Sequence, residues 1–212
     1  AIGAYALNAQ NAGTTAYNTA VGYQAGYSVS TGVRNTIVGG FAGDAVTSGQ
    51  QNTAVGYNSL SSSTDTSYNT AIGDSAMAVN VNGSRNVAVG NAALGNMNPA
   101  GDADTYNVAV GYDAGAAVTT GTLNTLIGAS AGDSLTTGEH NTAIGYAALA
   151  SEDEGNRSVA VGYKALETQN TDGSVYNVAV GHLAGQAITT ASNSTLIGGL
   201  AGDALTTGGQ NV

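Results

Sequence analysis

Residues 52–56 read Asn-Thr-Ala-Val-Gly, and close variants of this motif recur along the whole chain of 212 residues. The residue before the motif glycine is Val or Ile in all twelve copies. Neighbouring motif glycines are mostly 17 residues apart, with two steps of 19 and one of 21. A fixed period of this kind indicates a repeat architecture. The motif glycines are Gly3, Gly22, Gly39, Gly56, Gly73, Gly90, Gly111, Gly128, Gly145, Gly162, Gly181 and Gly198.

The repeat length and the motif both favour a β-solenoid. A 17-residue unit is too short for a helix pair or a propeller blade, but it fits one coil with two strands of about five residues and two turns. The motif alternates along the chain and ends at a glycine that can turn. We therefore predict an all-β fold, a parallel β-solenoid of twelve coils, running continuously over residues 1–212.

The residues after the motif glycine divide the coils into two classes. In one class the fourth residue after the glycine is Leu or Met, as at Leu60, and the seventh is usually polar, as at Ser63. In the other class the fourth residue is glycine, as at Gly26, and the seventh is always aliphatic, as at Val29. We interpret this exchange as one core volume filled from either of two backbone positions, because a coil cannot leave a leucine-sized void.

Composition and charge exclude several functions. The net charge is −10, and only four scattered residues are Lys or Arg. This is too few cations for binding nucleic acid, and the same balance argues against an anionic membrane surface. The chain has no Cys, which excludes disulfides, thiolate metal sites and thiol nucleophiles. No apolar run approaches the length of a membrane span.

The sequence offers no catalytic constellation. Ser and Thr are frequent, but no His and Asp are spaced to activate one of them. The glycines follow the repeat and form no phosphate-binding loop. His140 and His182 lack any metal-ligand spacing and occupy positions that other residue types fill in sister coils. We therefore expect neither an enzyme nor a bound cofactor.

Some polar positions have a structural and a binding interpretation. Asp44, Asp133 and Asp203 each follow Ala-Gly. The simpler interpretation is a hydrogen bond to the local turn, and the alternative is a structural cation such as calcium held by three symmetry copies. The run at residues 152–154, Glu-Asp-Glu, is predicted to be a solvated loop tip, and a cation role for it, or for Asp102 and Asp104, is the lesser alternative.

The motif asparagines are expected to form a hydrogen-bonded ladder between coils, as an architectural feature. They include Asn18, Asn35, Asn52, Asn69, Asn86, Asn107, Asn124, Asn141 and Asn177.

Tyrosines that follow the motif glycine or precede the motif asparagine either form an interface between chains or cover their own turns; both interpretations stay open. The insertions, residues 8–17, 95–106 and 167–176, are predicted to bulge from one edge, and those around Pro99 and Asp172 are the expected contacts with any partner.

Two families share these motifs. Repeats reading Asn-Thr-Ala-Val-Gly-Tyr-x-Ala-Leu resemble those in the shafts of phage tail fibres. Residues 157–162, Arg-Ser-Val-Ala-Val-Gly, are similar to the Ser-Val-Ala-Ile-Gly repeats in the heads of trimeric autotransporter adhesins, whose coils are shorter. The resemblance covers the whole chain. It implies a left-handed parallel β-roll of three chains side by side, extracellular, on a cell or virion surface.

These observations predict a structural fibre segment that forms or projects a rigid rod, with attachment to a host receptor or glycan as a further role. Both chain ends lie inside a motif at the same phase, which predicts a piece of a longer array or, alternatively, a filament subunit that stacks head to tail. A less favoured alternative is an ice-binding solenoid. Thr19, Thr36, Thr53 and Thr70 begin the threonine array that it needs, but Val87 interrupts it.

Overall fold

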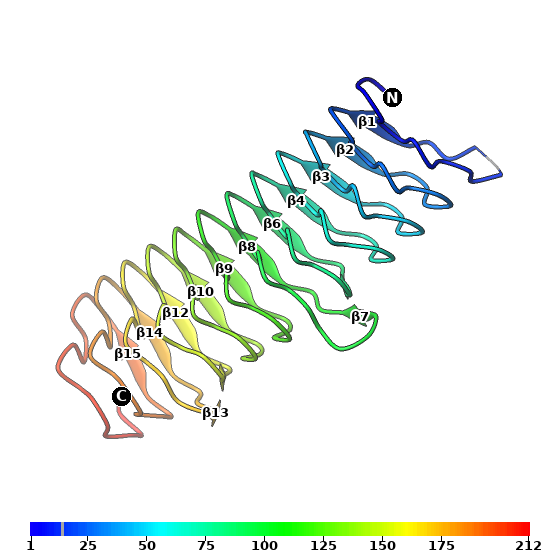
Figure 1. Ribbon diagram of the computed structural model, residues 1–212. Coiled ribbons are helices and arrows are strands. Elements are labelled where there is room, and N and C mark those ends of the chain that lie inside the picture. Colours follow the sequence, from blue (N-terminus) through cyan, green and yellow to red (C-terminus); the bar gives the residue numbers. More distant parts are fainter. Residues whose placement is uncertain (14) are drawn as a thin grey trace. The chain divides into compact units, whose positions relative to one another are not determined.

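The computed structural model describes residues 1–13 and 15–212, which form strands and turns but no helix. The chain divides into two compact units, Ala1–Tyr106 and Asn107–Val212. Figure 1 shows the short strands that recur in each unit. The motif strands have three residues each: β1 (Thr19–Val21), β2 (Thr36–Val38), β3 (Thr53–Val55), β4 (Thr70–Ile72), β6 (Val87–Val89), β8 (Val108–Val110), β9 (Thr125–Ile127), β10 (Thr142–Ile144), β12 (Val159–Val161), β14 (Val178–Val180) and β15 (Thr195–Ile197). Four further strands have two residues: β5 (Gly83–Ser84), β7 (Ala103–Asp104), β11 (Gly155–Asn156) and β13 (Gly173–Ser174).

The motif strands pair in parallel and in chain order within each unit. The order is β1-β2-β3-β4-β6 in the first unit and β8-β9-β10-β12-β14-β15 in the second. Equal motif positions lie side by side, and each strand contacts only its neighbours in the ladder. The predicted all-β parallel solenoid with a period near 17 residues is confirmed, while its left-handed sense and its three chains stay predictions. It has about 11 turns, one fewer than predicted, because the first motif copy forms only an isolated bridge between Ile2 and Val21.

The second predicted strand is reduced to two residues in four coils, at β5, β7, β11 and β13, and tight turns take its place in the others. In the coil that begins at Gly22, the amides of Ala25 and Tyr27 donate hydrogen bonds to the carbonyl oxygens of Gly22 and Gln24, at 3.4 and 3.1 Å, which makes Gln24 and Gly26 the third residues of these turns. Gln24 and Gly26 have φ angles of 54° and 61°. A positive φ at the third residue is the conformation of a type II turn, so the chain reverses without a second strand. The prediction of strands about five residues long was therefore wrong.

The core supports the exchange between the two coil classes. Leu60 and Val29 are both fully buried, although they occupy different positions in their coils. A Cβ added to Gly26 would lie 3.2 Å from Cγ2 of Val29 and 3.0 Å from Cδ1 of Ile37. Aliphatic atoms therefore occupy the space beside the glycine. Leu60 adopts a left-handed φ of 53°, a cost of about 1–2 kcal/mol, which burial of its side chain, about 1.5–3 kcal/mol, offsets.

Candidate functional site

The side of each ladder that faces away from the core is uncharged and combines a row of Val and Ile with a row of Thr and Val. We call this surface the outer sheet face; it consists of the first and third residues of the motif strands. The middle residue, such as Ala54, is fully buried, whereas the third residues Ile72, Ile127 and Ile144 are 38%, 38% and 36% exposed. Every third residue is Val or Ile, and every first residue is Thr or Val. This face carries no titratable group, so it can pack against another surface but cannot perform acid–base chemistry.

The motif asparagines tie neighbouring coils together beneath this face. Asn52 is 2% exposed. Its Nδ2 donates a hydrogen bond to the carbonyl oxygen of Thr66 at 2.8 Å, and its Oδ1 accepts one from the backbone amide of Asn69 at 3.0 Å. Asn35 makes the same two contacts one coil earlier, with Gly49 and Asn52. The side chain therefore satisfies backbone groups that the three-residue strands leave unpaired, which is an architectural role.

The motif glycines mark the closest approach between coils. Gly39 has a φ of 137°, and a Cβ added there would lie 2.6 Å from the carbonyl carbon of Gly56 in the next coil. Gly56 stands in the same relation to Gly73. Both the backbone angle and the neighbouring carbonyl group exclude a side chain, so the glycine is required by the stacking of coils.

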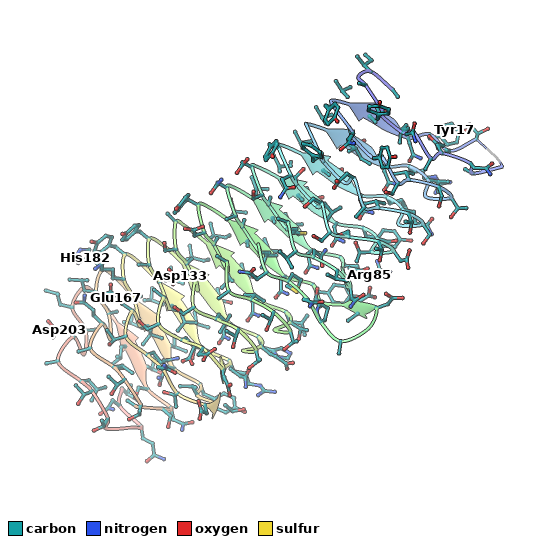
Figure 2. All side chains as sticks on the ribbon, viewed as in Figure 1. Tyr17, Arg85, Asp133, Glu167, His182 and Asp203 are labelled. Atoms are coloured by element: carbon teal, nitrogen blue, oxygen red, sulfur yellow. The ribbon has the colours of Figure 1, made fainter. Side chains whose placement is uncertain are left out.

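The aspartates proposed as cation ligands lie on separate coils. Asp44 belongs to the first unit, and Asp133 and Asp203 belong to the second, where Asp203 is exposed (Figure 2). Burial raises the pKa of Asp44 and of Asp133. Oδ1 of Asp44 is buried without a hydrogen-bond partner among the described residues. Nowhere in residues 1–13 and 15–212 do three acidic, His or Cys side chains gather as a metal site would need. The alternative of a cation between symmetry copies stays a prediction.

The prediction that residues 152–154 form a solvated loop tip was wrong for Glu152. Its side chain is fully buried, although Glu154 nearby is exposed. Oε1 accepts hydrogen bonds from the backbone amides of Gly155 at 2.8 Å and Thr171 at 3.2 Å. Oε2 accepts one from Nε2 of Gln169 at 2.7 Å. Glu152 occupies the seventh position after its motif glycine, and this coil position determines its burial more than its charge does.

The description of the cations as scattered was wrong for the arginines, because all three occupy the same position within their coils. Arg34 and Arg85 directly precede a motif asparagine, and Arg157 directly precedes Ser158, which fills the same motif position. All three have positive φ angles, between 61° and 64°. Figure 2 labels Arg85 and, at the equivalent position of the first coil, Tyr17. The Arg85 guanidinium lies 4.4 Å from the ring centroid of Tyr68, and its Nε lies 2.8 Å from Oδ2 of Asp104. Alignment by coil position would have revealed this column from the sequence.

Tyrosines and their neighbours form exposed aromatic rows beside the motif glycines. Tyr23 is 49% exposed and Tyr57 is 59% exposed. In the second unit, His182 stacks on Tyr163 with ring centroids 5.2 Å apart. His140 lies 3.9 Å from Glu139, and both are exposed. The exposed rings leave both interpretations of the tyrosines open.

Two insertions extend the ladder in part. β7 lies in the second insertion and pairs in parallel with β5, and β13 lies in the third and pairs with β11. Pro99 is buried, and its carbonyl oxygen accepts a hydrogen bond from Nδ2 of Asn82 at 3.1 Å. Asp172 is exposed. Parts of these two insertions therefore continue the parallel pairing between coils, and their bulging from one edge stays a prediction. The first insertion includes Thr14, which lies outside the described residues.

Comparison with known proteins adds no relative. No protein-family model, curated protein or solved structure matches this chain. Residues 1–13 and 15–212 include no helix long and apolar enough to cross a membrane. The resemblance to tail-fibre and adhesin repeats therefore rests on the motifs alone, and function has to be argued from the surfaces described above.

Proposed function

We propose that this chain is a structural segment of an extracellular surface fibre, of the tail-fibre or adhesin type, in which three copies pack through their outer sheet faces. The observation that carries the proposal is the unbroken row of Val and Ile at the third position of the motif strands. An exposed apolar stripe of this kind is typical of an interaction surface rather than of an isolated soluble chain. The neighbouring Thr and Val side chains add no charge that would have to be desolvated on packing.

The stiffness that a fibre needs would come from the coil-to-coil bonding. Successive coils exchange hydrogen bonds through the motif strand, through the turns and, in most coils, through the buried asparagine, whose position Ser158 and Ser194 fill in two others. Gly56, for example, donates its amide to the carbonyl oxygen of Val38 at 2.8 Å, and Gly43 donates to Ser59 at 2.8 Å. Bending the chain would stretch these bonds on one side of a coil. We infer a mechanical role, with no catalysis and no cofactor.

A charge on the outer sheet face tests the proposal. Ile72→Asp places a carboxylate in the proposed interface, while Val79→Asp places one in the same coil at a side chain that is 42% exposed but off the sheet. Light scattering on a size-exclusion column should give about three times the 20.6 kDa chain mass for the parent and for Val79→Asp. Ile72→Asp should give the mass of one chain with an unchanged far-UV circular dichroism spectrum, because burying an unpaired charge is strongly unfavourable.

Other masses would reject this assembly. A parent chain that stays monomeric at high concentration would show that the outer sheet face does not associate. Large species without a fixed size would instead support the head-to-tail filament. Equal effects of the two aspartates would show that association does not use the sheet.

A further inference from the structure

A row of aromatic rings runs along the first unit, one coil after another; its tyrosines are exposed and its phenylalanine is half-buried. We call it the aromatic row; it consists of Tyr5, Tyr23, Phe41 and Tyr57, with Tyr27 beside its first member. Successive ring centroids lie 6.2, 5.3 and 5.9 Å apart, with interplanar angles of 83°, 77° and 86°. Tyr27 meets Tyr5 at 6.4 Å and 71°. Every contact in the row is therefore edge-to-face.

Edge-to-face packing leaves ring faces open. In each such pair, the ring that contributes its edge keeps its own faces clear of its partner. The second unit provides the opposite arrangement at the residue directly after the motif glycine, the position that Tyr23 and Tyr57 occupy in the first unit. Tyr146, Tyr163 and His182 are stacked, with interplanar angles of 15° and 10°. Tyr163 therefore shares both faces with neighbours, whereas no pair in the aromatic row is stacked face to face, and Tyr5, Tyr23 and Tyr57 are 58%, 49% and 59% exposed.

The surroundings of the row favour a neutral ligand. No Lys or Arg occupies the two positions after the motif glycines in the first unit. The half-buried amides of Gln24 and Asn58 stand directly after Tyr23 and Tyr57 and can both donate and accept hydrogen bonds. With a net charge of −10, the chain also repels polyanions. Nucleobases would stack on open rings, but their phosphates find no cations here.

We propose that the aromatic row is a binding site for an extended neutral polysaccharide of β-linked pyranose rings. In such sugars the hydroxyl groups are equatorial and the ring faces present C–H bonds, which the negative face of an aromatic ring attracts. The ring of Phe41 is turned by 77° and 86° from its neighbours Tyr23 and Tyr57, so the rings on alternate coils are the ones that would stack on an extended sugar chain. The phenol hydroxyls and the two amides would bind the equatorial hydroxyls.

This site deepens the proposed function by giving a surface fibre a ligand class, but it does not depend on three chains. The aromatic row lies beyond the ends of the motif strands, and the outer sheet face comprises only residues within those strands. A monomer could therefore bind the sugar, and a trimer could fail to bind it, which separates the two proposals experimentally.

The probe is a β-1,4-linked glucose hexasaccharide, with a galacturonate hexamer as its acidic counterpart. The chain contains no Trp and 11 Tyr, so its tyrosine fluorescence reports directly on a ligand over the rings. Tyr57→Ser removes one ring of the row, and Tyr146→Ser is the matched control at an equivalent position of the stacked row. Titrations by calorimetry and fluorescence are run on the full chain, with the mass of each sample measured by light scattering.

The expected result is saturable binding of the glucose hexasaccharide, weakened about tenfold or more by Tyr57→Ser and unchanged by Tyr146→Ser. The galacturonate hexamer should bind far more weakly because of the acidic chain. Absence of binding at millimolar sugar would overturn the proposal, as would equal losses in the two variants or equal affinity for the acidic hexamer. An aromatic peptide that binds where the sugar does not would assign the row to a protein partner instead.

Discussion

Two adjacent glycines, Gly39 and Gly40, provide a sharp test of how the coils stack. Gly39→Ala places a Cβ 2.6 Å from the carbonyl carbon of Gly56, at a backbone φ of 137°. Gly40→Ala places one no closer than 3.6 Å, against Cδ2 of Tyr57, an ordinary contact. The two variants add the same methyl group one residue apart, so they differ in what that methyl group meets and in the backbone angle of the substituted residue.

The structure gives the size of the expected difference. The backbone conformation at Gly39 costs an alanine about 1–3 kcal/mol. Relieving the contact must move the next coil, which weakens the hydrogen bond from the Gly56 amide to Val38, worth about 0.5–1.5 kcal/mol. We expect Gly39→Ala to lower the free energy of unfolding by about 2–4 kcal/mol. Gly40→Ala should change it by less than about 1 kcal/mol.

Urea unfolding followed by far-UV circular dichroism measures both variants. At a urea m-value of about 2 kcal/mol per M, Gly39→Ala should unfold at a midpoint about 1–2 M below the parent. Gly40→Ala should unfold close to the parent. Equal midpoints for the two variants would refute the argument that close backbone approach at the motif glycine determines the stacking.

Three further perturbations test other parts of the coil by the same unfolding assay. Asn52→Ala leaves the carbonyl of Thr66 and a backbone amide unpaired in the interior, and should cost about 2–5 kcal/mol; a loss below about 0.5 kcal/mol would contradict the bridging role. Leu60→Gly should cost about 3–5 kcal/mol, and adding Ser63→Val should recover more than half of it, because this pair reproduces the other coil class; no recovery would reject the shared core volume. Asp44→Asn should raise the urea midpoint at pH 7, because burial raises the pKa of Asp44 and its ionised form opposes folding. This gain should vanish below the ordinary aspartate pKa of 3.8, and a gain that persists there would show that charge is not its cause.

The sequence predicted those features that repeat with the period. Parallel pairing follows from equal motif positions in successive coils, and the exchange between Leu60 and Val29 follows from a core of constant volume. Strand length was not predictable in this way, because turns at Gln24 and its equivalents use positive φ angles in residues other than glycine. The identity of such residues says little about their backbone angle, since the stacked coils impose it.

Among the candidate surfaces, too, the sequence predicted only what the repeated motif determines. The outer sheet face can be predicted from the alternation within the motif. The burial of Glu152 and the column of Arg34, Arg85 and Arg157 were missed because charge was considered residue by residue instead of by position within the coil. The orientation of rings in the aromatic row depends on neighbours in adjacent coils, such as Phe41 beside Tyr57, and no single repeat contains that information.

The restriction of each strand to its ladder neighbours has a genetic consequence. Recombination between two copies of the repeated coding sequence, at matching positions, adds or removes whole coils and keeps the reading frame. The coils on either side of the junction then meet through the same glycine, asparagine and strand contacts as before. The height of the array is therefore a heritable quantity that can change in one event, without a new fold having to evolve.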